Sequence, residues 1–254
     1  MHKGIGFDRK ILLPWLDATA ATCLQVDNPI LIRQRLEAIL VHDIGGADAR
    51  RKAIDLLMGI WVHSRSSAPM LRGQALELFQ SRAEPAEHIW LHYGLSLATY
   101  AFFRQCVAIM GQSARQGESV TTAAVKARMA AARGYPGGLK RAVERVVSSL
   151  RSWGLLEGSG QRHSYLARQR VYTTQDDSLQ VWLLACALHG HPAAELPFDD
   201  LLRLPELFPF ELTVGVAALR GRPEFEVQRL GGDWDSVRLV TPSSANQPLR
   251  RGHK

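Results

Sequence analysis

Residues 121–170 read TTAAVKARMAAARGYPGGLKRAVERVVSSLRSWGLLEGSGQRHSYLARQR, and the order of periodic and turn-forming segments in this stretch decides the fold. Its first part predicts a helix that begins at Thr121 or Thr122, whose hydroxyl can accept hydrogen bonds from free amides, and ends near Ala132. Residues 135–138, Tyr-Pro-Gly-Gly, cannot continue a helix and predict a turn. A second helix then begins at Leu139, and two short strands on either side of residues 158–160 predict a β-hairpin.

The second of these helices is amphipathic. Its apolar residues follow helical spacing and predict one buried face, made of Leu139, Val143, Val146, Val147 and Leu150. Its open faces carry Lys, Arg and Ser side chains, which are donors that contact DNA phosphates and guanine edges. Together with polar residues of the first helix and the hairpin, they form the predicted DNA-binding set: Thr122, Lys126, Lys140, Arg141, Arg145, Ser148, Arg151, Arg162 and Arg168.

The charge of the chain is concentrated in the same stretch. The 254 residues carry 31 Lys and Arg against 24 Asp and Glu, a formal net charge of +7. Residues 120–170 contain ten of the basic residues and two of the acidic ones, so the rest of the chain is close to neutral. A solvated helix face is the ordinary explanation of a charge run. The concentration in one fifth of the chain favours a surface that faces phosphates.

The residues before this stretch predict a bundle of about five helices over 1–113. Helical spacing of apolar residues is seen in 7–22, 30–41, 47–63, 70–81 and 85–112, and Asn28 followed by Pro29 is typical of a helix start. The apolar run 89–103 is too short to span a bilayer and predicts a buried core helix. The opening residues lack the apolar region of a signal peptide, and a domain boundary is expected between 112 and 118.

The residues after the stretch predict further helices and a second hairpin. A helix capped by Asp176, Asp177 or Ser178 should end near Gly190, and shorter helices are expected over 198–204 and 210–219. Alternating residues in 224–230 and 236–241 predict a terminal hairpin. The expected domains are therefore 1–113, 114–174 and 175–241, with a disordered tail over 242–254.

No group of residues predicts catalysis. The three cysteines are far apart and lack the spacing of a zinc ribbon, and a reducing cytoplasm suits them. His88 and His92 have the spacing of metal ligands on a helix, but a core or surface role is the more ordinary one. Asp199, Asp200, Asp233 and Asp235 are explained by helix capping and turns. We expect no enzyme activity, no cofactor and no metal.

Residues 139–168, LKRAVERVVSSLRSWGLLEGSGQRHSYLAR, resemble the recognition helix and wing of winged helix-turn-helix DNA-binding proteins. More weakly, the order of segments is similar to the BrxA family of bacterial BREX phage-exclusion systems, through SLQVWLLACALHGHP, LPELFPFEL and FEVQRLGGDWDSVRLV. This resemblance implies DNA binding without catalysis, beside larger defence proteins. The terminal helices and hairpin could form a second, degenerate winged element.

The sequence thus predicts a mainly α, cytoplasmic, non-enzymatic protein that binds double-stranded DNA as part of a phage-defence or DNA-processing system. A transcriptional regulator and an adaptor whose winged module docks a partner protein are the alternatives, because a fold alone does not fix a function. The sequence leaves open whether the chain binds larger partner proteins and whether it forms a homodimer. No membrane association is expected.

Overall fold

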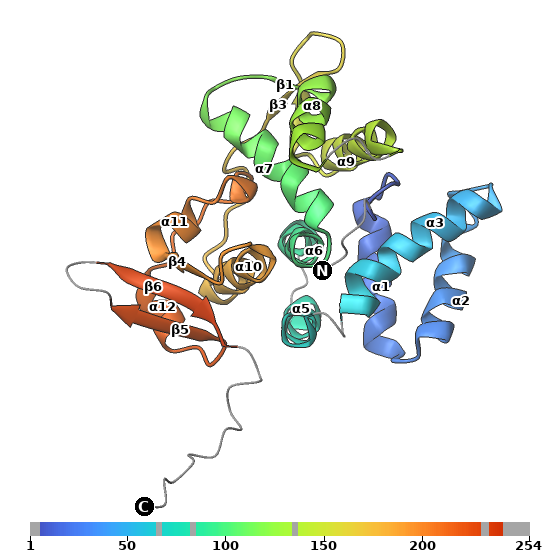
Figure 1. The fold of residues 1–254 in the computed structure, drawn as a ribbon. Coiled ribbons are helices and arrows are strands. Elements are labelled where there is room, and N and C mark those ends of the chain that lie inside the picture. Colours follow the sequence, from blue (N-terminus) through green and yellow to red (C-terminus); the bar gives the residue numbers. More distant parts are fainter. Residues whose placement is uncertain (1–5, 65–67, 82–84, 134–136, 230–233, 241–254) are drawn as a thin grey trace, which may run out of the picture.

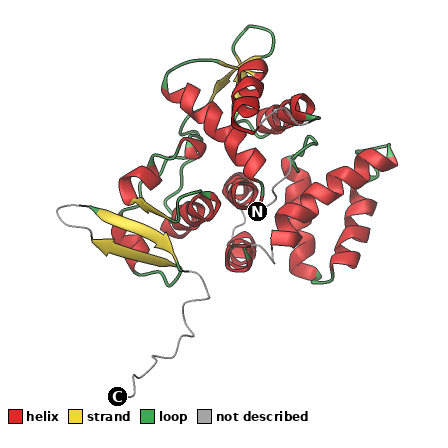
Figure 2. Cartoon of the chain, viewed as in Figure 1, coloured by secondary structure: helices red, strands yellow, loops and turns green. Residues whose placement is uncertain are grey.

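The chain folds into a mainly helical molecule with two small antiparallel sheets, as the mainly α prediction requires (Figures 1 and 2). The computed structural model describes residues 6–64, 68–81, 85–133, 137–229 and 234–240. The predicted tail over 242–254 lies outside these residues. The two sheets lie apart from each other, one beside α8 and α9 and one at the C-terminal end of the described chain (Figure 2).

The first half of the chain forms the predicted helices, except that the helix predicted over 7–22 begins only at Leu13, and residues 7–12 are not helical. The helices are α1 (Leu13–Gln25), α2 (Pro29–Leu40), α3 (Ala47–Met58) with a π-helical continuation η1 (Gly59–His63), α5 (Pro69–Ser81) and α6 (Pro85–Thr99). Pro14 lies in the first turn of α1, where its missing N–H costs no hydrogen bond. Asn28 caps α2 as predicted, since its side chain accepts from the amides of Ile30 and Leu31.

The long helix predicted over 85–112 is wrong in one respect, because it is broken at Tyr100. Residues 89–99 of α6 are buried on every side, as a core helix should be. Tyr100 then takes an extended backbone conformation, and its hydroxyl donates to the carbonyl of Leu56. The ring lies where a side chain on Gly59 would be, so η1 and Tyr100 pack closely only because residue 59 is glycine. This tertiary contact has no local sequence signal.

The basic stretch and the helix before it form one module. It comprises α7 (Ala101–Arg115), β1 (Val120–Thr121), α8 (Thr122–Arg133), α9 (Leu139–Ser152), β2 (Leu156–Gly158) and β3 (Ser164–Ala167). β3 lies between β1 and β2 and pairs antiparallel with both. The predicted buried face of α9 is buried. The boundary expected at residue 113 falls inside α7, which packs on α8, α9 and the sheet.

The C-terminal part is less helical than predicted. It comprises α10 (Asp177–Gly190), β4 (Glu195–Pro197), α11 (Phe198–Leu202), η2 (Pro205–Leu207), α12 (Val216–Arg220), β5 (Phe225–Arg229) and β6 (Asp235–Leu239). Asp176 caps α10, and β5 and β6 form the predicted hairpin. The helix predicted over 210–219 is wrong before Val216. The amides of Glu211, Thr213 and Val214 are instead bonded to the carbonyl of Tyr172 and the side chain of Gln180.

The two sheets have the same strand order. In each, the last strand lies between the first two, as β1-β3-β2 and as β4-β6-β5. Each module also begins with a long helix, α7 or α10. Two α-helices lie between its first and second strands, and the second module has the short 3-10 helix η2 there as well. The sequence did not predict β4, which has three residues.

One hydrophobic cluster joins all parts of the described chain. α7 connects the two modules closely, because a side chain on Gly111 would overlap the carbonyl of Pro205 in η2. Gly94 of α6 allows a similar approach to the ring of Trp182 in α10. Among the described residues, none of the helices has the length and apolar character that a bilayer crossing requires.

Candidate nucleic-acid interface

The exposed face of α9 forms the centre of the candidate interface. Its helical periodicity buries the apolar residues against α7 and α8 and leaves Lys140, Arg141 and Arg145 exposed. Gly138 precedes the helix with φ at 88°, a conformation that glycine adopts without strain. Gly138, the N-cap residue, has no side chain that could accept a hydrogen bond from the first-turn amides of α9.

α8 contributes a second set of polar groups. The hydroxyl of Thr121 accepts a hydrogen bond of 3.0 Å from the amide of Ala124, so Thr121 and not Thr122 caps this helix. Thr122 is therefore the first helical residue, and its amide donates to the carbonyl of His163 at 3.3 Å. Lys126, one turn further on, is half-buried.

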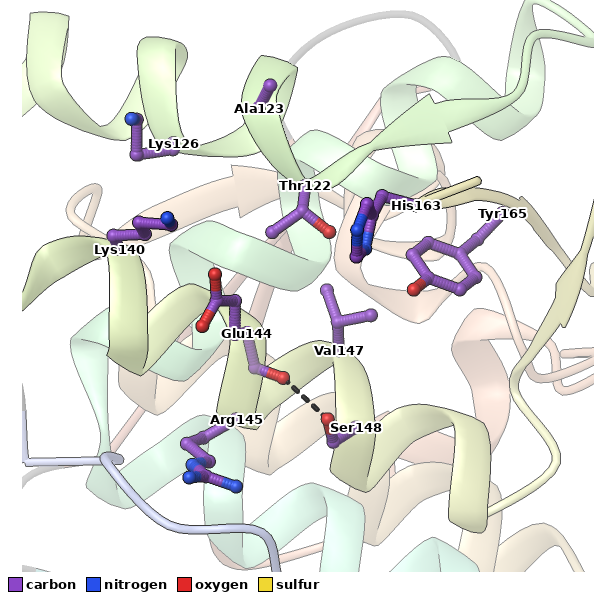
Figure 3. Close-up of a pocket in the computed structure, with 10 residues that line it drawn as sticks. All are labelled: Thr122, Ala123, Lys126, Lys140, Glu144, Arg145, Val147, Ser148, His163 and Tyr165. Atoms are coloured by element: carbon purple, nitrogen blue, oxygen red, sulfur yellow. Dashed lines mark hydrogen bonds between the residues drawn. The ribbon is translucent and has the colours of Figure 1, made fainter. Parts of the chain in front are cut away.

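α8, α9 and β3 enclose a groove of about 510 Å³, here called the β3-side groove. Figure 3 shows Thr122 at its centre, Lys126 and Lys140 to one side of the view, and the rings of His163 and Tyr165 to the other. The groove brings together five of the nine predicted residues. Its lining is Thr122, Ala123, Lys126, Lys140, Glu144, Arg145, Val147, Ser148, His163 and Tyr165.

Two serines of α9 have different roles. Ser148 lines the β3-side groove, and its hydroxyl donates to the carbonyl of Glu144 at 2.8 Å (Figure 3). Its oxygen can still accept a hydrogen bond. Ser149 cannot contact DNA, because its side chain is buried beneath the N-terminal segment. The Ser149 hydroxyl donates to the carbonyl of Arg145 and accepts the amide of Ile11 at 2.9 Å.

A second groove, here called the α3-side groove, lies on the other flank of α9 and has a volume of about 440 Å³. Arg141 and Arg145 line it from α9, and Arg9 and Lys10 line it from the segment before α1. The start of α3 completes it with Asp48 and Ala49. Sequence reasoning missed Arg9 and Lys10, because they precede α9 by about 130 residues and no local pattern links them to it.

The remaining three predicted residues lie outside both grooves. The guanidinium of Arg151 lies over the ring of Tyr165, 5.2 Å from its centroid, which holds α9 against β3. Arg162, in the loop between β2 and β3, donates from Nε to Nε2 of His163 at 3.2 Å. Arg168 donates to the carbonyl of Gly154 at 3.1 Å and thereby closes the turn between α9 and β2.

Comparison of the chain with protein-family models, curated proteins and solved structures gives no match. The resemblances to winged-helix proteins and to the BrxA family therefore stay predictions.

The cluster of His88, His92 and Asp17 in the helical half is explained by packing. Nδ1 of His88 lies 2.7 Å and Nε2 of His92 lies 3.0 Å from the same oxygen of Asp17. Trp61 donates to Nδ1 of His92 at 3.2 Å, and because an indole N–H can only donate, the His92 proton is on Nε2. That nitrogen donates to Asp17 and has no lone pair for a metal. Among the described residues, no cluster of three or more His, Cys, Asp or Glu suits a metal ion.

The other acidic residues considered as metal ligands have structural partners or positions. Asp199 and Asp200 lie in the first turn of α11, where a carboxylate suits the helix dipole, although Pro197 is the cap residue. Asp235 pairs with Arg220 at 2.5 Å. Asp233 lies outside the described residues. All three cysteines are buried.

Proposed function

We propose that the chain binds double-stranded DNA and that residues 101–167 form a winged helix-turn-helix that presents α9 to the duplex. The observation that carries the proposal is the pair of basic grooves on either flank of the exposed face of α9. A protein that binds phosphates with Lys and Arg displaces condensed counterions, which supplies much of its affinity for DNA. The order of α7, β1, α8, α9, β2 and β3 is consistent with this module.

The side chains of α9 suit both kinds of DNA contact. Arg141 and Arg145 are exposed one turn apart, and an Arg guanidinium can bind the O6 and N7 atoms of guanine through two hydrogen bonds. Thr122, Lys126 and Lys140 are suited to phosphates, since hydroxyl and ammonium groups position a protein without reading sequence. Glu144 lies among them and can accept from the amino group of cytosine.

The proposal contains no catalytic step. Because the order of segments resembles the BrxA family, we propose that the chain acts beside larger proteins of a bacterial phage-defence or DNA-processing system. In such a system a non-enzymatic subunit would hold DNA for its partners.

Titration of a fluorescent 25-base-pair duplex at increasing salt tests the proposal. We expect log Kd to rise linearly with log salt concentration, with a slope of several units. The double variant Lys140→Ala/Arg145→Ala should lose roughly 1 to 3 kcal/mol per contact. Arg238→Ala, on β6 and paired with Glu226, removes one charge elsewhere and is the control. Wild-type protein that does not bind duplex, or a double variant that binds as tightly as wild type, would contradict the proposal.

A protein-binding adaptor is the second candidate, and the charge of the C-terminal module favours it. Residues 175–241 contain eleven Asp and Glu against five Arg, the opposite balance to residues 120–170. Trp234, next to β6, is 66% exposed. Such a module would repel DNA phosphates and is suited to a protein surface. A stoichiometric partner that co-purifies after nuclease treatment, from protein that binds no duplex at physiological salt, would favour the adaptor.

A further inference from the structure

The N-terminal segment, residues 7–12, is fixed to α9 by its backbone. The amide of Ile11 donates to the hydroxyl of Ser149 at 2.9 Å, and the carbonyl of Ile11 accepts from Nε1 of Trp153 at 3.0 Å. The side chains of Phe7 and Ile11 are fully buried, and the ring of Phe7 packs on Phe103 of α7 with 5.0 Å between centroids. The position of this segment along α9 is therefore determined on both sides of Lys10.

Lys10 is the exposed residue that this anchoring places beside α9. Its side chain lines the α3-side groove together with Arg141 and Arg145. It also lines a further hollow of about 400 Å³ with Ser148 and Arg151. Lys10 therefore lies at one edge of the exposed face of α9, and β3 lies at the opposite edge.

The positive charge of the α3-side groove is not neutralised. Within the described part of the chain, Lys10, Arg141 and Arg145 make no ion pair. Asp48 is the one acidic residue that lines the groove, and it is paired at 2.7 Å with both Arg51 and Lys52. Three cations in one groove repel each other, and a bound polyanion would relieve this repulsion.

We infer that the α3-side groove binds phosphates of the second DNA strand and that Lys10 contacts the DNA backbone there. The inference rests on the proposed function and deepens it. An α-helix with its side chains is about 10–12 Å across and fills a major groove about 12 Å wide, so that phosphates of both strands lie along its flanks. The β3-side groove then takes phosphates of one strand, and the α3-side groove takes those of the other.

This arrangement gives the helical N-terminal half a role in DNA binding. α3 and the N-terminal segment form the wall of the α3-side groove that faces α9. The protein would therefore contact the duplex from two sides, with the N-terminal half on one DNA strand and the β3 side on the other. α9 would lie in the major groove between them.

The test measures how duplex affinity depends on salt in the full-length variant Lys10→Ala. The loss of one phosphate contact should reduce the slope of log Kd against log salt by about one unit. Affinity should fall roughly three- to tenfold at low salt, by the same amount for specific and random duplexes. Lys10→Arg should keep the slope. Lys10 is exposed, so the urea midpoint should not change, and Arg238→Ala again controls for net charge.

Each outcome decides the inference. An unchanged slope in Lys10→Ala, while Lys140→Ala/Arg145→Ala binds more weakly, overturns the inference and leaves the proposed function standing. Equal losses in Lys10→Ala and Arg238→Ala also overturn it, because the effect would then come from overall charge. Wild-type protein that binds no duplex overturns both. As a second variant, Asp48→Asn removes the acidic residue of the groove and should tighten binding.

Discussion

Nε1 of Trp61 donates a hydrogen bond to Nδ1 of His92, 31 residues further along the chain, across 3.2 Å. His92 is fully buried, and its other nitrogen lies 3.0 Å from the carboxylate of Asp17. The imidazole is thus held neutral, with one proton in a known position between α1, η1 and α6. Protonation of Nδ1 would break the hydrogen bond to Trp61 and place a second donor against it.

The first prediction is that stability falls as the pH decreases below about 6.5. Burial lowers the pKa of His92 below 6.5, and the hydrogen bond and charge of Asp17 oppose burial without cancelling it. Below 6.5 the unfolded chain therefore binds a proton that the folded chain excludes, and stability is lost as pH falls. If His92 stays neutral, the loss reaches about 2 kcal/mol at pH 5. Urea unfolding at pH 7.5 and 5 measures it.

The control for this effect is His92→Gln. Glutamine can donate to Asp17 and accept from Trp61 but does not titrate, so its stability should depend less on pH than that of wild type. Equal pH dependence of the two proteins would show that His92 does not cause the loss.

At more acidic pH, a second loss should come from Asp17. Burial raises the pKa of this carboxyl, but its hydrogen bonds with His92 and His88 outweigh burial and lower the pKa below 3.8. The stabilisation is complete above 3.8 and is lost as pH falls through the lowered pKa of the folded state. Asp17→Asn should therefore flatten the stability profile below pH 4, as measured by urea midpoints. An unaltered profile would assign the acid loss to other carboxylates.

The next prediction concerns the close contact between α7 and η2. Gly111→Ala should destabilise the protein by at least about 1 to 3 kcal/mol, because the new methyl group overlaps the backbone carbonyl of Pro205, which cannot rotate away. Thermal unfolding measures the change. Gly73→Ala in α5 is the matched control, because its methyl group meets no atom within 4 Å and alanine favours the helix by about 0.5 to 1 kcal/mol. Changes of the same sign in the two variants would contradict this assignment.

Substitution of Gln180 should destabilise the folded protein more than substitution of most other polar residues. Its fully buried amide donates to the carbonyl of Thr174 and the hydroxyl of Thr213, and it accepts the amides of Thr213 and Val214. Gln180→Leu leaves these groups without partners and should cost at least about 2 kcal/mol in a urea titration. Gln80→Leu, at an exposed position of α5, should change stability by less than about 0.5 kcal/mol. A small effect at Gln180 would mean that water replaces the amide.

Arg145 and Arg168 both belong to the predicted DNA-binding set, but their replacement should change duplex affinity by different amounts. Arg145 lines both grooves, whereas Arg168 donates to the carbonyl of Gly154 and lines neither. Duplex affinity should therefore fall more in Arg145→Ala than in Arg168→Ala. The latter should instead lower the unfolding temperature slightly, through the loss of one exposed hydrogen bond. Equal losses of affinity in the two variants would indicate that DNA also contacts the end of β3.

The parts of the fold that the sequence predicts are those determined locally. Asn28 caps α2, the apolar residues of α9 repeat with helical spacing, and Asp176 caps α10, and all three depend on residues within about one turn. Element types were predictable where such periodicity is long. β4 has three residues and gains its strand geometry only by pairing with β6, so no local pattern identifies it.

The errors have a shared physical cause, which is competition from distant groups. Helix formation before Val216 is prevented because Gln180 binds the amides that a helix would use. The helix over 85–112 breaks because the ring of Tyr100 packs at Gly59. In the candidate interface, the residues on α8 and α9 came from local periodicity. Lys10 was missed because its position depends on hydrogen bonds to Ser149 and Trp153.

The contact between Ile11 and Ser149 also orders events during biosynthesis. The two residues are 138 positions apart, so at roughly 5–20 residues per second the N-terminal segment leaves the ribosome about 7 to 28 seconds before its partner helix is made. Phe7 and Ile11 are both buried in the finished protein, and the ring partners of Phe7, Tyr100 and Phe103, are made before α9. A nascent chain therefore lacks the hydrogen bonds of Ile11 to Ser149 and Trp153 until α9 and the residue after it have emerged.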